Sequence, residues 1–140
     1  MSVYLDASVL VALFTQDAFT VRARTFLAAQ LPALIVSDFA AAEFASAVAR
    51  LVRTQEITRE LARAVFADFD AWRDHGTDAA LAEPSDILAA TSFIRRLDLT
   101  LRTADAINIA IAQRLDAALA TFDVKMTASA RALGIRIADA

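Results

Sequence analysis

The order of short apolar segments and longer amphipathic segments narrows the choice of fold for this chain. The short segments are mostly apolar and do not alternate with polar residues, as expected for parallel strands that are covered on both faces. The predicted strands are Val3–Leu5, Ala33–Val36, Ala79–Leu81, Ala117–Phe122 and Ile135–Ile137. The predicted helices are Ser8–Phe14, Val21–Gln30, Phe39–Arg53, Thr58–Trp72, Asp86–Leu97, Ala104–Leu115 and Val124–Leu133. We therefore expect an α/β protein with a parallel sheet.

Length and composition favour a single domain over residues 1–140, because 140 residues that are 58% hydrophobic can bury one full core. Charged residues interrupt every apolar segment before it reaches the ~18 residues that would cross a bilayer. The amino terminus, MSVYLDASVL, has no basic region ahead of an apolar one and is read as a structural element. Cysteine is absent, which excludes disulfides and thiolate metal sites. These features predict a cytoplasmic protein.

Several functional classes are excluded by what the chain lacks. Its net charge of −3 gives no bulk positive field for nucleic acid, so any RNA contact must be local. The two glycines are too few for a P-loop or a Rossmann turn. His75 is the only histidine and is predicted in a surface loop, so a Ser-His-Asp triad is not expected. Gly134 is predicted to cap a helix in the left-handed conformation.

Four acidic residues fall at junctions between predicted elements. Asp6 follows the first strand in VYLDAS, Asp105 opens a helix in LRTADAINIA, and Asp123 ends a strand in ALATFD. Glu43 lies one turn into the helix SDFAAAEFASAVARL. The carboxyl ends of parallel strands and the amino ends of the following helices share one edge, where ligands bind. We therefore expect these carboxylates to converge.

Each acid also has an ordinary structural explanation. Asp6 and Asp123 could be helix N-caps, Asp105 could favour the positive end of a helix dipole, and Glu43 could be a solvated surface charge. Convergence of four acids from separate elements favours a functional site over four coincidences. The remaining junction acids are assigned to helix ends and turns, with Asp38 as the cap of the Glu43 helix: Asp38, Asp86, Asp98 and Asp116.

Clustered carboxylates predict a bound cation. Two of them ~5 Å apart repel by ~3 kcal/mol at an effective dielectric constant near 20. Such a cluster survives by raising its pKa values or by binding a hard divalent cation, and oxygen ligands suit Mg²⁺ or Mn²⁺. The absence of cysteine and of a nearby histidine disfavours zinc.

The order LDAS, AAAEF, TADAINIA and LATFD resembles that of a PIN domain over nearly the whole chain. The resemblance implies a three-layer α/β/α sandwich around a parallel sheet of about five strands. It also implies that all four acids are catalytic and that Asp6, Asp105 and Asp123 bind metal. Ser8 and Thr121 match hydroxyl positions that orient the carboxylates. Asn108 stands where many relatives have histidine, and it could orient Asp105.

Small single-domain chains of this kind resemble VapC toxins of type II toxin–antitoxin systems. That resemblance implies a Mg²⁺-dependent endoribonuclease for which Mn²⁺ can substitute, a cognate VapB-like antitoxin, and a homodimer. The candidate RNA-binding cations, which could also form only a solvated face, are Arg22, Arg24, Arg50, Arg53, Arg102 and Lys125.

Three alternatives remain open. The chain could be a PIN nuclease that acts in RNA processing or on structured DNA without an antitoxin. It could also be a non-catalytic α/β binding protein whose acids are only caps. A phosphatase with Asp6 as nucleophile is disfavoured, because Ser8 stands where such enzymes have a second aspartate.

Overall fold

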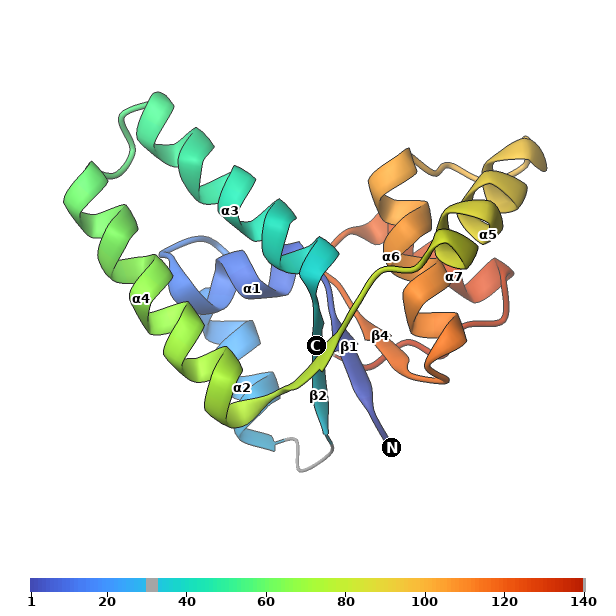
Figure 1. The fold of residues 1–140 in the computed structure, drawn as a ribbon, viewed down its shortest axis with the longest axis horizontal. Helices are drawn as coiled ribbons and strands as arrows, with labels where there is room; N and C mark the ends of the chain where they lie inside the picture. Colours follow the sequence, from blue (N-terminus) through green and yellow to red (C-terminus); the bar gives the residue numbers. More distant parts are fainter. Residues whose placement is uncertain (30–32, 140) are drawn as a thin grey trace.

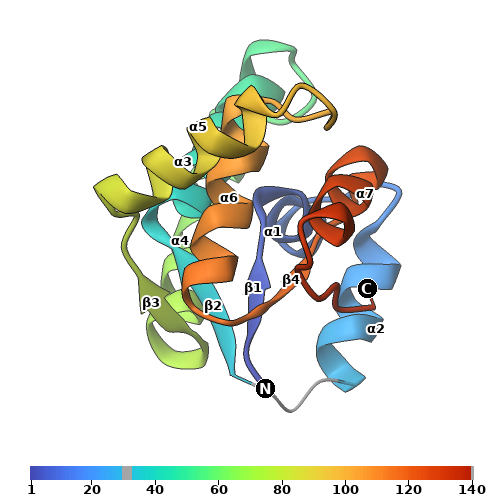
Figure 2. The same ribbon diagram turned by 90° about the vertical axis from the view of Figure 1, so that its right-hand side faces the viewer.

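A parallel sheet in the order β3-β2-β1-β4 forms the centre of the fold (Figures 1 and 2). The computed structural model describes residues 1–29 and 33–139. Its strands are β1 (Val3–Leu5), β2 (Leu34–Ser37), β3 (Asp78–Ala80) and β4 (Ala118–Ala120). Tyr4 of β1 pairs with Ile35 of β2 on one side and with Leu119 of β4 on the other. The predicted α/β fold with a parallel sheet is confirmed.

Helices cover both faces of this sheet, and Figure 1 shows α1–α4 on one side of the strands and α5–α7 on the other. The helices are α1 (Ala7–Phe14), α2 (Thr20–Ala29), α3 (Asp38–Arg53), α4 (Arg59–Gly76), α5 (Pro84–Arg95), α6 (Thr103–Arg114) and α7 (Val124–Ala132). This is the expected three-layer arrangement. Within the described ranges, no helix is both long and apolar enough to cross a membrane.

The sheet differs from the prediction at its last strand. Residues 135–137 form only an isolated parallel bridge, between Ile137 and Leu119 of β4. Leu119 donates to the Arg136 carbonyl at 2.8 Å and accepts from the Ala138 amide at 2.8 Å, so pairing is limited to this one point. The named sheet therefore has four strands where five were expected.

Several predicted helix boundaries also shift. The predicted helix Thr58–Trp72 continues to Gly76, so His75 lies exposed in the last turn of α4 and the predicted loop is wrong. Thr58 is the N-cap of α4, since its hydroxyl accepts from the Leu61 amide at 3.1 Å. Gly134 has φ +79°, which confirms its left-handed conformation. The last residue of the predicted helix Val21–Gln30 lies outside the described residues.

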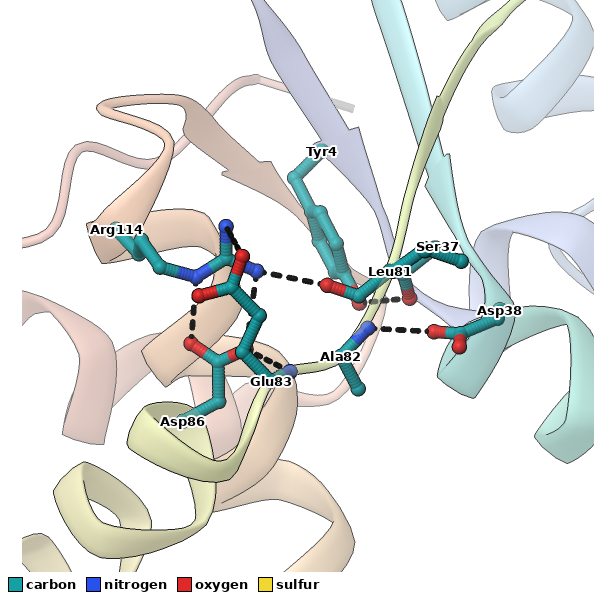
Figure 3. Close-up of polar contacts among 8 residues, drawn as sticks. All are labelled: Tyr4, Ser37, Asp38, Leu81, Ala82, Glu83, Asp86 and Arg114. Carbon is teal, nitrogen blue, oxygen red and sulfur yellow. Dashed lines mark hydrogen bonds and ion pairs between the residues drawn. The ribbon is translucent and has the colours of Figure 1, made fainter.

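Ser37 caps α3 in place of the predicted Asp38. The Ser37 hydroxyl accepts from the Ala40 amide at 2.9 Å. The Asp38 carboxylate instead accepts from the Ala82 amide at 2.7 Å, in the segment between β3 and α5 (Figure 3). Serine is as good a cap as aspartate, so the sequence pattern alone does not choose between Ser37 and Asp38. In the structure Ser37 has the extended backbone of a cap. Asp38 therefore fastens the connection that leaves β3.

The same connection is held from the other side by Arg114 of α6 (Figure 3). Its guanidinium donates to both carboxylate oxygens of the buried Asp86, at 2.9 and 3.0 Å, and to the Leu81 carbonyl at 2.8 Å. Burial raises the pKa of Asp86, but the hydrogen bonds from Arg114 and the Glu83 amide and the Arg114 charge outweigh it and lower that pKa. Asp86 thus lies in the first turn of α5, as predicted, and is in addition the ion-pair partner of Arg114.

Burial of β1 and α6 gives the candidate site a firm base. Val3, Tyr4 and Leu5 have no exposed surface, and α6 is buried at every position from 106 to 112. In Figure 1 β1 and β2 run upward, and β2 leads directly into the first turn of α3. The junction acids therefore start from an edge whose backbone is fixed by packing.

Candidate carboxylate site

Asp6 follows β1 and is 5% exposed. Its Oδ1 accepts from the Ser8 hydroxyl at 2.6 Å and from the Val9 amide at 3.1 Å, and its Oδ2 accepts from the Thr121 hydroxyl at 2.5 Å. The Val9 bond makes Asp6 the N-cap of α1. Burial raises the pKa of Asp6 despite these hydrogen bonds, which favour the ionised form. A nearby positive charge would offset the cost of burying the ionised Asp6 carboxylate.

Ser8 and Thr121 join the β1–α1 junction to the β4–α7 junction. The Ser8 hydroxyl accepts from the Phe122 amide at 3.0 Å, and the Thr121 hydroxyl accepts from the Asp123 amide at 3.1 Å. Each hydroxyl donates to Asp6, so the Asp6 carboxylate and the Asp123 backbone share one hydrogen-bonded unit. Asp123 caps α7 through the Met126 amide at 3.0 Å.

Glu43 lies in the second turn of α3 and is half-buried. Asn108 donates its Nδ2 to Glu43 Oε1 at 2.6 Å and to the Ala104 carbonyl at 3.1 Å. Its side chain therefore contacts Glu43 instead of Asp105, the residue that it was expected to orient. Burial raises the pKa of Glu43, the Asn108 hydrogen bond lowers it, and the nearby charges of Asp6 and Asp105 raise it further.

Asp105 lies in the first turn of α6 and is also half-buried. Burial raises its pKa, a hydrogen bond from the Arg102 backbone lowers it, and the Asp123 charge raises it. Asp105 and Asp123 line a cleft of about 450 Å³. The other lining residues are Leu99, Thr100, Leu101, Arg102 and Lys125. The two acids thus line the same cleft as two basic side chains, Arg102 and Lys125.

The four acids form an electrostatically connected group, named here the carboxylate cluster: Asp6, Glu43, Asp105 and Asp123. Glu43 interacts with both Asp6 and Asp105, and Asp105 interacts in turn with Asp123. Like charges at this range raise the free energy of the folded protein unless a proton or a cation offsets them. The cluster therefore has the electrostatic character of a cation site.

The side chains do not form a closed ligand shell. Among residues 1–29 and 33–139, no three acidic or histidine side chains approach closely enough to bind one ion. Both oxygens of Asp6 already accept hydrogen bonds from protein donors, namely Ser8, Val9 and Thr121. The donor chemistry nevertheless fits a hard divalent cation, because every candidate ligand is a carboxylate.

The candidate cations are distributed unevenly. Arg102 and Lys125 line the cleft, whereas Arg24 lines a separate cavity of about 620 Å³. Arg22 lies over the rings of Phe19 and Phe122, at 5.6 and 5.0 Å from their centroids. The two remaining candidates are exposed at the far end of α3: Arg50 and Arg53.

Tyr4 and Ser37 lie beside the carboxylate cluster and were not predicted as part of the site from the sequence. The Tyr4 hydroxyl contacts the Ser37 hydroxyl at 2.6 Å and donates to Asn108 at 2.5 Å. Tyr4 was read only as part of a buried strand. Its available signal was the phenol itself, because a tyrosine inside an apolar strand needs a hydrogen-bond partner.

Comparisons with known proteins agree with this architecture. The sequence model of the PIN domain matches residues 3–132. The fold is similar to that of VapC20 from Mycobacterium tuberculosis, a sarcin–ricin loop cleaving toxin, with a TM-score of 0.73 and 19% identity over 91% of this chain and 94% of that one. It is similar to VapBC2 from Rickettsia felis bound to promoter DNA (0.70, 14% identity, 98% and 97% covered). It is also similar to FitAcB from Neisseria gonorrhoeae (0.69, 14%, 96% and 95%). No curated protein sequence matches.

Proposed function

The chain belongs to the PIN domain family, and we propose that it is a Mg²⁺-dependent endoribonuclease that acts as the toxin of a type II toxin–antitoxin pair. The carboxylate cluster beside the cleft is the observation that carries this proposal. Nucleases of this family generally use divalent metal ions. The similarity in fold to VapC20, a toxin that cleaves the sarcin–ricin loop, supports RNA as the substrate.

In this proposal Asp6, Asp105 and Asp123 hold the ion, with Glu43 completing the group of acids. When bound, a divalent ion supplies Lewis acidity for the attack of water on the phosphodiester. Ser8 and Thr121 fix the Asp6 carboxylate by the hydrogen bonds described above, which leaves it little rotational freedom. Mn²⁺ is expected to substitute for Mg²⁺, because both prefer oxygen ligands.

Arg102 and Lys125 are proposed to contact RNA phosphates at the cleft. Changing either to Gln is expected to weaken RNA binding and to make the negative slope of log K against log salt shallower by roughly 0.7, the value for one phosphate contact with a single strand. Fluorescence anisotropy with labelled RNA at several salt concentrations measures the slope. Arg136→Gln is the matched control, because Arg136 is exposed and pairs with Asp116. An unchanged slope in both cleft variants would remove these residues from the RNA site.

The partner in this proposal is a VapB-like antitoxin. The similarity in fold to VapBC2 and FitAcB supports a partner of this kind. An antitoxin encoded beside this chain would be expected to cover the cleft and to prevent cleavage.

One RNA cleavage assay tests both parts of the proposal. The purified chain is expected to cut RNA with Mg²⁺ or Mn²⁺, to stop with EDTA, and to be inhibited by the product of the neighbouring gene. Sequencing of the RNA ends gives the cleavage position. Cleavage that the neighbouring product does not inhibit would favour a nuclease of RNA processing. Absence of cleavage with either ion would favour a non-catalytic binding protein.

A further inference from the structure

A buried chain of hydrogen bonds leads from the start of α3 to Glu43. The Ser37 hydroxyl accepts from the Ala40 amide. It also contacts the Tyr4 hydroxyl at 2.6 Å (Figure 3). The Tyr4 hydroxyl donates to Asn108 Oδ1 at 2.5 Å. Asn108 Nδ2 then donates to Glu43 Oε1 at 2.6 Å. The chain therefore connects β1, the end of β2, α6 and α3.

The direction of every hydrogen bond in this chain is fixed. A phenol has one hydrogen, and Tyr4 gives it to Asn108, so the hydrogen between Tyr4 and Ser37 must come from Ser37. The second amide hydrogen of Asn108 goes to the Ala104 carbonyl at 3.1 Å. Asn108 therefore presents an N–H to Glu43, and a flipped amide would place oxygen against two acceptors.

Burial makes this arrangement hard to replace by water. Tyr4, Ser37 and Asn108 are 0%, 1% and 2% exposed. Glu43, by contrast, is half-buried and has a long side chain that would otherwise sample several rotamers. Its neighbours Asp6 and Asp105 carry like charges that disfavour its approach. The Asn108 amide is thus the attractive contact that offsets this repulsion.

We propose that Tyr4 and Asn108 are positioning residues that hold Glu43 toward Asp6 and Asp105, with Ser37 setting the direction of the Tyr4 hydroxyl. This inference rests on the proposed function, since it treats Glu43 as part of the nuclease site. Tyr4 does not line the cleft, so its effect on catalysis would be transmitted through Asn108.

The Tyr4→Phe variant tests the proposal because it removes one hydroxyl and keeps the ring. It is expected to lower kcat by up to about 10-fold, the lower end of the loss seen when a direct hydrogen-bond partner of a metal ligand is removed, because Tyr4 reaches Glu43 only through Asn108; KM for RNA is expected to stay unchanged. The same change in a Glu43→Gln background is expected to cause no further loss. An equal further loss in that background would show that Tyr4 does not act through Glu43.

A matched control separates positioning from general destabilisation. Thr15→Val removes a hydroxyl from a residue that is 9% exposed, where Thr15 donates to the Val11 carbonyl at 2.7 Å at the end of α1. This variant is expected to retain the wild-type kcat even if its melting temperature falls as far as that of Tyr4→Phe. A matching loss of kcat in Thr15→Val would overturn the proposal.

A readout that needs neither metal nor activity is the side-chain amide of Asn108 in ¹H–¹⁵N spectra. In the wild-type protein its two hydrogens are expected to be resolved and protected from exchange. In Tyr4→Phe these two hydrogens are expected to exchange faster with solvent. The difference between their chemical shifts is expected to shrink, as it should in Glu43→Gln. An Asn108 signal unchanged by Tyr4→Phe would overturn the positioning chain, even if the protein proved not to be a nuclease.

A second variant keeps the test decisive if Tyr4→Phe does not fold. Asn108→Leu keeps the number and branching of the side-chain heavy atoms and removes the donor to Glu43 directly, so it is expected to lose at least as much kcat. This loss should also vanish in the Glu43→Gln background. A wild-type protein that cuts RNA, together with an Asn108→Leu variant of undiminished kcat, would refute positioning while leaving the nuclease proposal intact.

Discussion

Asp6→Asn is expected to lose RNA cleavage by at least about 100-fold, because a metal ion at such a site supplies several kcal/mol of transition-state stabilisation. Asparagine keeps the shape of Asp6 but lacks the charge that would hold the cation. Its amide oxygen can still accept from Ser8 and Val9, and its NH₂ group can face the Thr121 hydroxyl oxygen. The measurement is single-turnover cleavage of RNA in Mg²⁺.

The fold of Asp6→Asn is expected to survive, so the loss of activity will report on chemistry. Asparagine caps helices as well as aspartate does, and the circular dichroism spectrum should not change. Asp116→Asn is the control, because Asp116 is exposed and lies past the opposite end of α6, about 16 Å from Asp105 along the helix. Full cleavage by Asp6→Asn would contradict the assignment, as would equal inactivation of Asp116→Asn.

The structural and the functional explanations of the junction acids are compatible. Asp6 and Asp123 each cap a helix, which is the ordinary structural explanation that the sequence offered for them. A cap occupies one carboxylate oxygen, and the residue that follows a parallel strand and precedes a helix stands at the ligand-binding edge for the same geometric reason. Finding a cap at such a position is therefore not evidence against a site.

Most strand segments and the position of the acids at strand ends could be predicted from the sequence, because both depend on local patterns, whereas the order of the strands could not. A continuously apolar strand such as Val3–Leu5 is recognisable without its neighbours, and Asp6 directly after it must lie at the carboxyl edge. The end of α4 and the reduced strand at 135–137 were less accessible. Whether a helix continues for one more turn, or a strand pairs at one point or three, depends on packing against distant segments.

The partner of Asn108 could not be read from the sequence for a related reason. Spacing along α6 makes Asp105 a neighbour at i−3, but it gives no information about side chains from α3. The fold brings Glu43 and Tyr4 to Asn108 across 65 and 104 residues of sequence. The positioning chain thus became visible only when the register of the sheet was known.

The metal-free protein is expected to become less stable as the pH rises from about 4 toward neutrality. Burial raises the pKa of Asp6, Glu43 and Asp105 above the ordinary carboxyl values near 4 of the unfolded chain. The folded state therefore binds more protons in this window. The stability gained from these protons is fully present below the unfolded pKa values and is lost as the pH passes the folded ones.

A divalent cation is expected to reverse this loss at neutral pH, which makes stability a direct assay of the carboxylate cluster. At a Mn²⁺ concentration of 100 times Kd at neutral pH the expected stabilisation is about 2.7 kcal/mol, and the same concentration should stabilise less at pH 5 because protons compete for the same oxygens. Thermal melts at pH 5 and 7.5, with Mn²⁺ or with EDTA, measure both effects. Asp6→Asn should lose the response to Mn²⁺ and, lacking a buried charge, should melt no lower than the wild-type protein in EDTA at pH 7.5. A melting temperature that Mn²⁺ raises equally in Asp6→Asn would place the ion elsewhere on the protein.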